Sequence, residues 1–273
     1  MKDGRYQILL TNDDGIASPG LWAAAEALSS LGYVTVIAPR DQSSGTGRSL
    51  PISTDGYIRP GPLTIHNQEW TVYSVGGTPA QAVQHAIMEI METPPDVVVS
   101  GINYGENLGE GITVSGTVGA AMEAAALGIP ALAASLELVT NDYYSYSTTV
   151  DFSSAAYFTC LFTRYLLENH LPAGVDLLKL DVPHNATPTT PWHMTSLAKH
   201  QYYIAYVDHK RDWNEPYKIP ARIQVTEDEV TPDSDIRVLH FDHQVSLTPI
   251  TLNMTARVSL TDMEKQVQAD LKE

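Results

Sequence analysis

Short apolar runs alternate with longer amphipathic runs along the first two thirds of the chain. The apolar runs predict strands at residues 6–11 (YQILLT), 33–38 (YVTVIA), 96–100 (DVVVS), 129–136 and 177–182, with further strand-like stretches in 65–75. The amphipathic runs predict helices from residue 19 to about residue 30, over 79–92 and 117–127, and from residue 153 to about residue 168. Strands and helices in alternation form a parallel sheet covered by helices, so we predict an α/β fold.

Single residues set the bounds of the first helix. Ser18 and Pro19 supply an N-cap and a first-turn proline, and Gly32 is expected to end the helix as its C-cap. Loops rich in Gly, Ser, Asn and Asp are predicted at residues 12–17, 39–49 and 101–116. The polar parts of this core are therefore the loops that follow strands.

The pattern changes after residue 187. Residues 188–255 alternate polar, aromatic and β-branched side chains, as in 202–207 and 223–225, which predicts exposed hairpins or an oligomerisation arm. An amphipathic helix is predicted over 261–271, with Thr261 as its N-cap. We therefore divide the chain into an α/β core at 1–187 and a region at 188–273 that holds the arm, a return strand and the C-terminal helix.

Composition narrows the classes of partner. The chain has 16 Lys and Arg against 32 Asp and Glu, a formal net charge of −16, whereas binding to duplex nucleic acid needs a basic surface. We therefore expect no duplex nucleic acid as a partner. The single Cys160 allows no intrachain disulfide and favours the cytoplasm. No signal peptide and no apolar tract suited to a membrane span is found, so no membrane association is expected.

Polar residues follow the predicted strands where the carboxyl ends of a parallel sheet meet. They are Asp13 and Asp14 after the first strand, Ser43 and Ser44 after the second, and Asn103 and Asn107 after Ser100. These oxygen donors suit Mg²⁺, Mn²⁺ or Ca²⁺, and adjacent aspartates repel each other unless a cation lies between them or one is protonated. On the tetrapeptide NDDG alone, a simple turn is the stronger interpretation.

A second candidate site precedes the helix at 117–127. Ser115, Gly116 and Thr117 have the layout of a phosphate cradle at a helix N-terminus, although simple N-capping by Ser115 or Thr117 explains the same residues. The dinucleotide-binding glycine fingerprint, the P-loop, the HExxH zinc motif and the GxSxG nucleophile motif do not occur. Their absence disfavours pyridine nucleotide, P-loop, zinc-hydrolase and α/β-hydrolase chemistry.

Several short motifs occur in a fixed order along nearly the whole chain. They are ILLTNDDGI at 8–16, SPG at 18–20, AP at 38–39 with SG at 44–45, SL at 49–50, GTPA at 77–80, VSGINYGENLG at 99–109, SGT at 115–117 and VSLTPI at 245–250. Together they resemble the SurE family of metal-dependent nucleotidases, and the resemblance favours a metal site over a turn at Asp13 and Asp14. Arg40-Asp41 and the tyrosine-rich stretch at 200–207 depart from the family pattern and leave the base preference open.

The resemblance implies a Rossmann-like three-layer core with a mainly parallel sheet, a protruding β-hairpin arm and a C-terminal helix exchanged between subunits of a homodimer or homotetramer. It implies phosphate release from nucleoside 5′-monophosphates with one Mg²⁺ or Mn²⁺ per subunit. The implied residues are Asp13, Asp14, Ser44 and Asn103 as metal ligands, Asp13, Asp14 and Asn107 in catalysis, and Asn107 with Ser115, Gly116 and Thr117 around the phosphate. The alternative is a non-catalytic nucleotide-binding regulatory module on the same fold.

Overall fold

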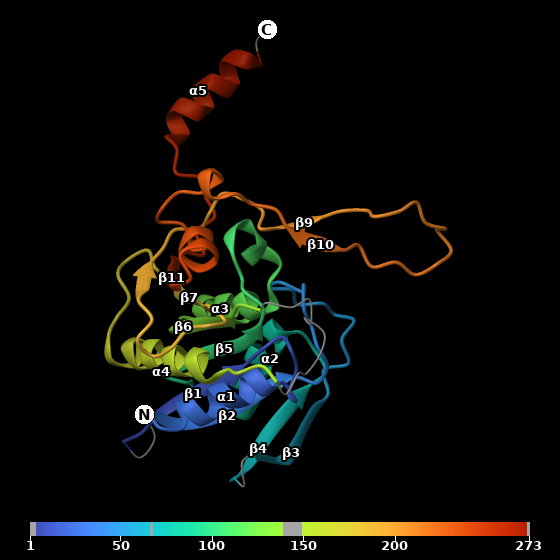
Figure 1. Cartoon of the computed structure of the whole chain (residues 1–273). Helices are drawn as coiled ribbons and strands as arrows, with labels where there is room; N and C mark the ends of the chain where they lie inside the picture. The colour runs from blue at the N-terminus through green and yellow to red at the C-terminus, as the bar shows by residue number, and fades with distance from the viewer. Residues whose placement is uncertain (1–3, 66–67, 139–148, 272–273) are drawn as a thin grey trace.

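A nine-stranded sheet forms the centre of the protein (Figure 1). The computed structural model describes residues 4–65, 68–138 and 149–271. In sheet order the strands are β3 (Ile58–Ile65), β4 (Gln68–Val75), β2 (Gly32–Pro39), β1 (Tyr6–Thr11), β5 (Val97–Tyr104), β6 (Ala131–Leu136), β7 (Leu177–Val182), β11 (Val245–Ile250) and β8 (Trp192–Met194). The strands from β4 to β7 are parallel, while β3 is antiparallel to β4 and β11 is antiparallel to β7.

Helices cover both faces of this sheet. The helices α1 (Pro19–Leu28) and α4 (Ser153–Glu168) lie on one face, and α2 (Pro79–His85) and α3 (Gly116–Ala126) lie on the other (Figure 1). Within β1 the fully buried Ile8 and Leu10 belong to the first hydrophobic layer and Leu9 to the second, as the alternation of side chains along a strand requires. The predicted three-layer, mainly parallel α/β fold is confirmed.

The expected C-cap glycine has another function. The helix α1 ends at Leu28 with Ser29 as its C-cap, and Gly32 begins β2. A Cβ atom at Gly32 would lie 2.4 Å from the backbone oxygen of Tyr6. The prediction was wrong because the close passage of β1, which is a tertiary contact, requires the glycine at this position.

The strand expected at 96–100 is longer than predicted, and the loop after it is shorter. The strand β5 continues through Gly101, where a Cβ would lie 2.3 Å from the backbone oxygen of Ala134, and ends at Tyr104. Its pairing with β6 shifts register between Ser100 and Asn103. A 3₁₀ helix, η2 (Gly109–Val114), occupies most of the remaining loop. As a result, Asn103 lies on the end of a strand.

Most of the other predicted elements differ from the structure by one or two residues at their ends, and two differ by more. The helix expected over 79–92 ends as α2 at His85 and continues as a π-helical turn over Ala86–Ile90. The stretch at 65–75 divides into the end of β3 and the whole of β4, and residues 66–67 lie outside the described residues.

The last third of the chain extends away from the core. The strands β9 (Tyr203–Ala205) and β10 (Ala221–Ile223) pair in an antiparallel hairpin that projects to one side, and α5 (Leu260–Asp270) stands apart from the sheet (Figure 1). The N-cap of α5 is Ser259, whose hydroxyl accepts a hydrogen bond from the Asp262 N–H at 3.3 Å, and not Thr261 as predicted. Within the described ranges, none of the helices is long and apolar enough to cross a membrane.

Candidate functional site

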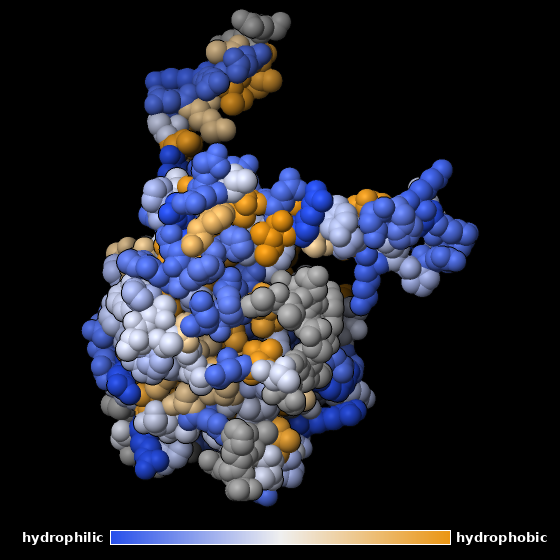
Figure 2. All heavy atoms as spheres, in the orientation of Figure 1, coloured by the Kyte–Doolittle hydropathy of each residue, from blue (hydrophilic) through white to orange (hydrophobic). Residues whose placement is uncertain are grey.

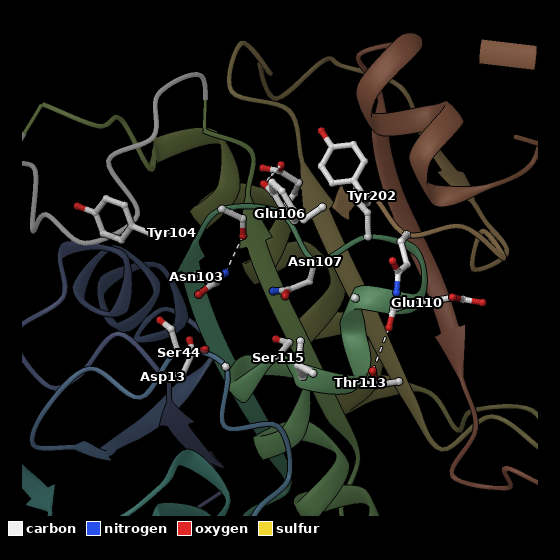
Figure 3. Close-up of a pocket in the computed structure, with 17 residues that line it drawn as sticks. Asp13, Ser44, Asn103, Tyr104, Glu106, Asn107, Glu110, Thr113, Ser115 and Tyr202 are labelled. Carbon is white, nitrogen blue, oxygen red and sulfur yellow. Dashed lines mark hydrogen bonds between the residues drawn. The ribbon is translucent and has the colours of Figure 1, made fainter. Parts of the chain in front are cut away.

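A cavity of about 410 Å³ opens at the carboxyl ends of β1, β2 and β5 (Figure 3). Its lining comes from the loops after these strands, from η2 and from the segment before β9, and comprises Asp13, Ser44, Gly45, Glu110, Gly111 and residues 103–108, 113–115 and 201–203. In an open α/β sheet this edge is where ligands bind.

Asp13 lies at the base of this cavity and is held from the N-terminus of α3. The Thr117 hydroxyl donates a hydrogen bond to Asp13 Oδ1 at 2.5 Å, and the backbone N–H groups of Gly116 and Thr117 also bond the carboxyl group. A Cβ at Gly116 would lie 2.7 Å from the Asp13 Cβ, so glycine is required for this approach. Burial raises the pKa of Asp13, and these hydrogen bonds oppose the rise.

Asp14 lies next to Asp13 and is 2% exposed, against 3% for Asp13. Its Oδ2 atom accepts a hydrogen bond from the Tyr104 N–H at 3.1 Å, and its Oδ1 atom accepts one from the Gln42 side chain at 3.4 Å. Burial, followed by the charge of Asp13, raises the pKa of Asp14 to about 8. Two buried carboxyl groups whose ionisation is this unfavourable indicate a place built for positive charge.

Ser44 and Asn103 bring further oxygens to the same place. Gln42 donates to Ser44 Oγ at 3.1 Å, and the Asn103 amide nitrogen donates to the Gly105 backbone oxygen at 2.6 Å. The amide oxygen of Asn103 therefore points toward Ser44 and Asp13 (Figure 3). Carboxylate, hydroxyl and amide oxygens form a donor set that fits a hard divalent cation such as Mg²⁺ or Mn²⁺.

The charge of the lining also favours a bound cation. Its ionisable acids are Asp13, Glu106 and Glu110, and the described residues that line the cavity include no lysine or arginine. An anionic ligand that entered would meet only negative formal charge. A cation that entered with such a ligand would offset this repulsion.

Asn107 and Ser115 also line the cavity. The Asn107 side chain donates to Ser135 Oγ at 2.8 Å. Ser115 is the N-cap of α3, and its Oγ accepts from the Val118 N–H at 3.1 Å, which leaves the hydroxyl proton for another acceptor.

Five of the predicted site residues therefore line the cavity together, namely Asp13, Ser44, Asn103, Asn107 and Ser115. The other three do not line the cavity. Gly116 and Thr117 contact Asp13 from behind the lining, and Asp14 lies beside Asp13. Ser115 caps the helix, as one of the two interpretations of the Ser115–Thr117 motif predicts, and it also lines the cavity.

Behind the segment at 107–109, of which residues 107 and 108 line the cavity, lies a fully buried ionic cluster of Lys179, Asp181 and Asp235. Lys179 Nζ bonds to the Asp181 carboxylate, to Asp235 Oδ2 at 3.1 Å and to the Asn107 backbone oxygen at 2.7 Å. The N–H of Asn107 donates to Asp181 at 2.7 Å, and that of Gly109 donates to Asp235 at 2.9 Å. The cluster therefore fixes the backbone that presents Asn107.

Sequence reasoning did not single out this cluster, nor Glu106, Tyr202 and Tyr203 in the lining. A signal for Lys179 and Asp181 exists in the strand LLKLDV, where two charged side chains interrupt an otherwise apolar buried run. Glu106 lies inside the motif at 99–109, and the two tyrosines belong to the stretch noted as a departure from the family pattern.

Comparison with known proteins identifies the family. Residues 8–204 match the family model described as "Survival protein SurE". The chain belongs to the SurE family. It is 39% identical over 270 residues to a 5′-nucleotidase SurE of Methanocella arvoryzae (96% of this chain, 98% of the relative) and 40% identical over 259 residues to one of Thermococcus kodakarensis (95% and 97%).

The structural comparison agrees with the sequence comparison. The crystal structure of the SurE protein from Aquifex aeolicus superposes with a TM-score of 0.71 at 30% sequence identity, covering 98% of this chain and 100% of that one. The predicted membership of the SurE family is thus confirmed, and the site described above lies inside the matched residues.

Proposed function

We propose that this cavity is the active site of a 5′-nucleotidase that releases phosphate from nucleoside 5′-monophosphates with the aid of a divalent cation. The relatives named 5′-nucleotidase SurE, about 40% identical over nearly the full length, support the reaction. The observation that carries the role of the cation is the buried pair of Asp13, in the lining, and Asp14, beside it, together with a lining whose described residues include no lysine or arginine.

The residues that would hold the cation are Asp13, Asp14, Ser44 and Asn103, with one Mg²⁺ or Mn²⁺ per subunit. The all-oxygen chemistry of these donors supports this assignment. When bound, the cation supplies Lewis acidity that neutralises phosphate charge and makes a water molecule acidic enough to attack at neutral pH.

The other residues hold and orient the reactants. The Thr117 hydroxyl fixes the rotamer of Asp13 by its bond to Oδ1, and the Tyr104 N–H does the same for Asp14. The Ser115 hydroxyl proton and the second amide proton of Asn107 are donors for the phosphate oxygens, where they stabilise the charge of the transferring phosphoryl group. The single cysteine, which allows no intrachain disulfide, supports a cytoplasmic location.

Phosphate release from a panel of nucleoside 5′-monophosphates at saturating Mn²⁺ or Mg²⁺ tests the activity. We expect release from several members of the panel, with multiple turnovers per subunit. Saturable nucleotide binding without phosphate release would contradict the proposal and favour the non-catalytic regulatory module.

We also propose that the protein assembles as a homodimer or homotetramer through α5. Its residues Leu260, Met263, Val267 and Leu271 follow helical spacing and are 67%, 56%, 46% and 81% exposed. Figure 2 shows such hydrophobic side chains gathered along the protruding helix. Deleting residues 259–273 is expected to reduce the number of subunits in the oligomer, which light scattering measures as a lower molar mass. An unchanged number of subunits would contradict this assignment.

A further inference from the structure

The cavity has two chemically different ends. Asp13, Ser44 and Asn103 lie together at one end, and Glu106 and Tyr202 lie at the other (Figure 3). If the phosphate is held at the Asp13 end, the nucleoside extends toward Glu106. A carboxyl group at that end suits an uncharged part of the substrate that donates hydrogen bonds.

The carboxyl group of Glu106 is fixed in place. The side chain is 4% exposed, its Oε1 atom accepts a hydrogen bond from the Tyr203 hydroxyl, and its Oε2 atom accepts one from the Leu138 N–H at 3.3 Å. A carboxylate has about four acceptor positions, so these two bonds leave acceptor capacity on both oxygens. The pair of oxygens is thus preorganised to receive two further donors.

The position of Glu106 in the chain indicates which part of a nucleotide it meets. Glu106 lies directly before Asn107 and three residues after Asn103, which lies at the Asp13 end of the cavity (Figure 3). The sugar is the part of a nucleotide joined directly to the phosphate, whereas the base lies further out. Gln201, Tyr202 and Tyr203 also line the cavity, and Tyr202 lies at the end away from Asp13 (Figure 3).

We infer that Glu106 is a specificity-determining residue that accepts hydrogen bonds from the 2′- and 3′-hydroxyls of a ribose, so that the enzyme prefers ribonucleotides to deoxyribonucleotides. A vicinal diol offers two O–H donors with the spacing of a carboxylate, and acidic side chains recognise ribose in this way in other nucleotide-binding folds. The inference rests on the proposed function, because it requires the phosphate to lie at the Asp13 end.

The test compares kcat/KM for AMP, 2′-deoxy-AMP and p-nitrophenyl phosphate in the wild type and in Glu106→Gln. We expect the wild type to favour AMP over 2′-deoxy-AMP, and Glu106→Gln to lower kcat/KM for AMP by about tenfold or more, because a charged hydrogen bond in a buried site is lost. The value for 2′-deoxy-AMP, which keeps the 3′-hydroxyl, should fall by a smaller factor than that for AMP, and the value for p-nitrophenyl phosphate, which has no sugar, should stay within about twofold.

Glu110→Gln is the matched control, since it removes a carboxylate from an exposed part of the same lining. Its ratio of AMP to 2′-deoxy-AMP activity should equal that of the wild type. Tyr203→Phe leaves Glu106 in the chain but removes the hydroxyl that orients it, and should shift the ratio in the same direction by a smaller factor. This second variant keeps the test decisive should Glu106→Gln fold poorly.

Two results would overturn the inference. One is an equal loss for AMP and 2′-deoxy-AMP in Glu106→Gln. The other is a loss of kcat/KM in Glu106→Gln that occurs only for nucleotides whose base carries an exocyclic amino group, among ribonucleotides and deoxyribonucleotides alike. That result would place Glu106 against the base. Absence of p-nitrophenyl phosphate and nucleotide hydrolysis in the wild type would instead contradict the proposed function itself.

Discussion

Replacing Asp13 by asparagine is expected to lower phosphate release from nucleoside 5′-monophosphates by about a thousandfold or more, because both cation binding and charge stabilisation are lost. Asparagine has nearly the same shape as aspartate, and its amide oxygen can still accept the Thr117 hydroxyl that bonds Asp13 Oδ1. The substitution therefore removes charge and leaves the packing against Gly116 intact.

Stability measurements separate this effect from unfolding. Burial raises the pKa of Asp13. Burial and the charge of Asp13 together raise the pKa of Asp14 to about 8. Ionisation of the two carboxyl groups therefore opposes folding when no cation is present. In chelator at pH 9, Asp13→Asn should therefore melt at the same temperature as the wild type or higher.

The control for Asp13→Asn is Asp41→Asn. Asp41 is an exposed carboxylate in the loop after β2 that pairs with Arg40 and lies outside the cavity lining. Its replacement should leave kcat within about twofold, as surface substitutions away from a site usually do. If Asp13→Asn kept more than a tenth of the wild-type kcat, Asp13 would not be a ligand of the required cation.

Replacing Lys179 by methionine is expected to lower the free energy of unfolding by about 3–5 kcal/mol, the usual cost of leaving buried charges without their partner. Lys179 bonds Asp181 and Asp235, and all three side chains are fully buried. Methionine fills similar space but leaves two carboxyl groups without a cation. Urea denaturation at pH 7 measures the difference.

Lys199→Met is the matched control, because Lys199 is exposed and lies outside the cluster; its effect should stay within about 0.5 kcal/mol. Adding Asp181→Asn to Lys179→Met should recover part of the lost stability, because one of the two uncompensated charges is then removed. Equal effects of Lys179→Met and Lys199→Met would contradict the assignment of the cluster as an anchor of the 107–109 segment.

The sequence predicts the parts of this fold that depend on local pattern. The strands β1 and β7 have the predicted bounds, because each is a short, mostly apolar run that is buried on both faces. The errors at Gly32 and at the end of β5 have a common cause. In both places a glycine allows close approach to the backbone of another strand, and sequence alone does not reveal which strand passes there.

The candidate site also has a part that local pattern predicts and a part that depends on tertiary contacts. Asp13, Ser44 and Asn103 were predictable, since each lies at or after the end of a strand and strand ends converge in a parallel sheet. The partners of Glu106 and Lys179 were not predictable. The contact of Glu106 with Tyr203 joins residues 97 apart, and that of Lys179 with Asp235 joins residues 56 apart, so both depend on how the last third of the chain packs on the core.

The most direct test of the central claim, that a divalent cation in the Asp13 cavity supports nucleotide hydrolysis, is phosphate release from AMP after chelator treatment, with Mg²⁺ or Mn²⁺ added back separately. Release is predicted to stop with chelator and to return when one of the metals is restored, because the lining holds acidic side chains and, among its described residues, no lysine or arginine to bind the phosphate. Full AMP hydrolysis in metal-free, chelator-treated protein would contradict the account.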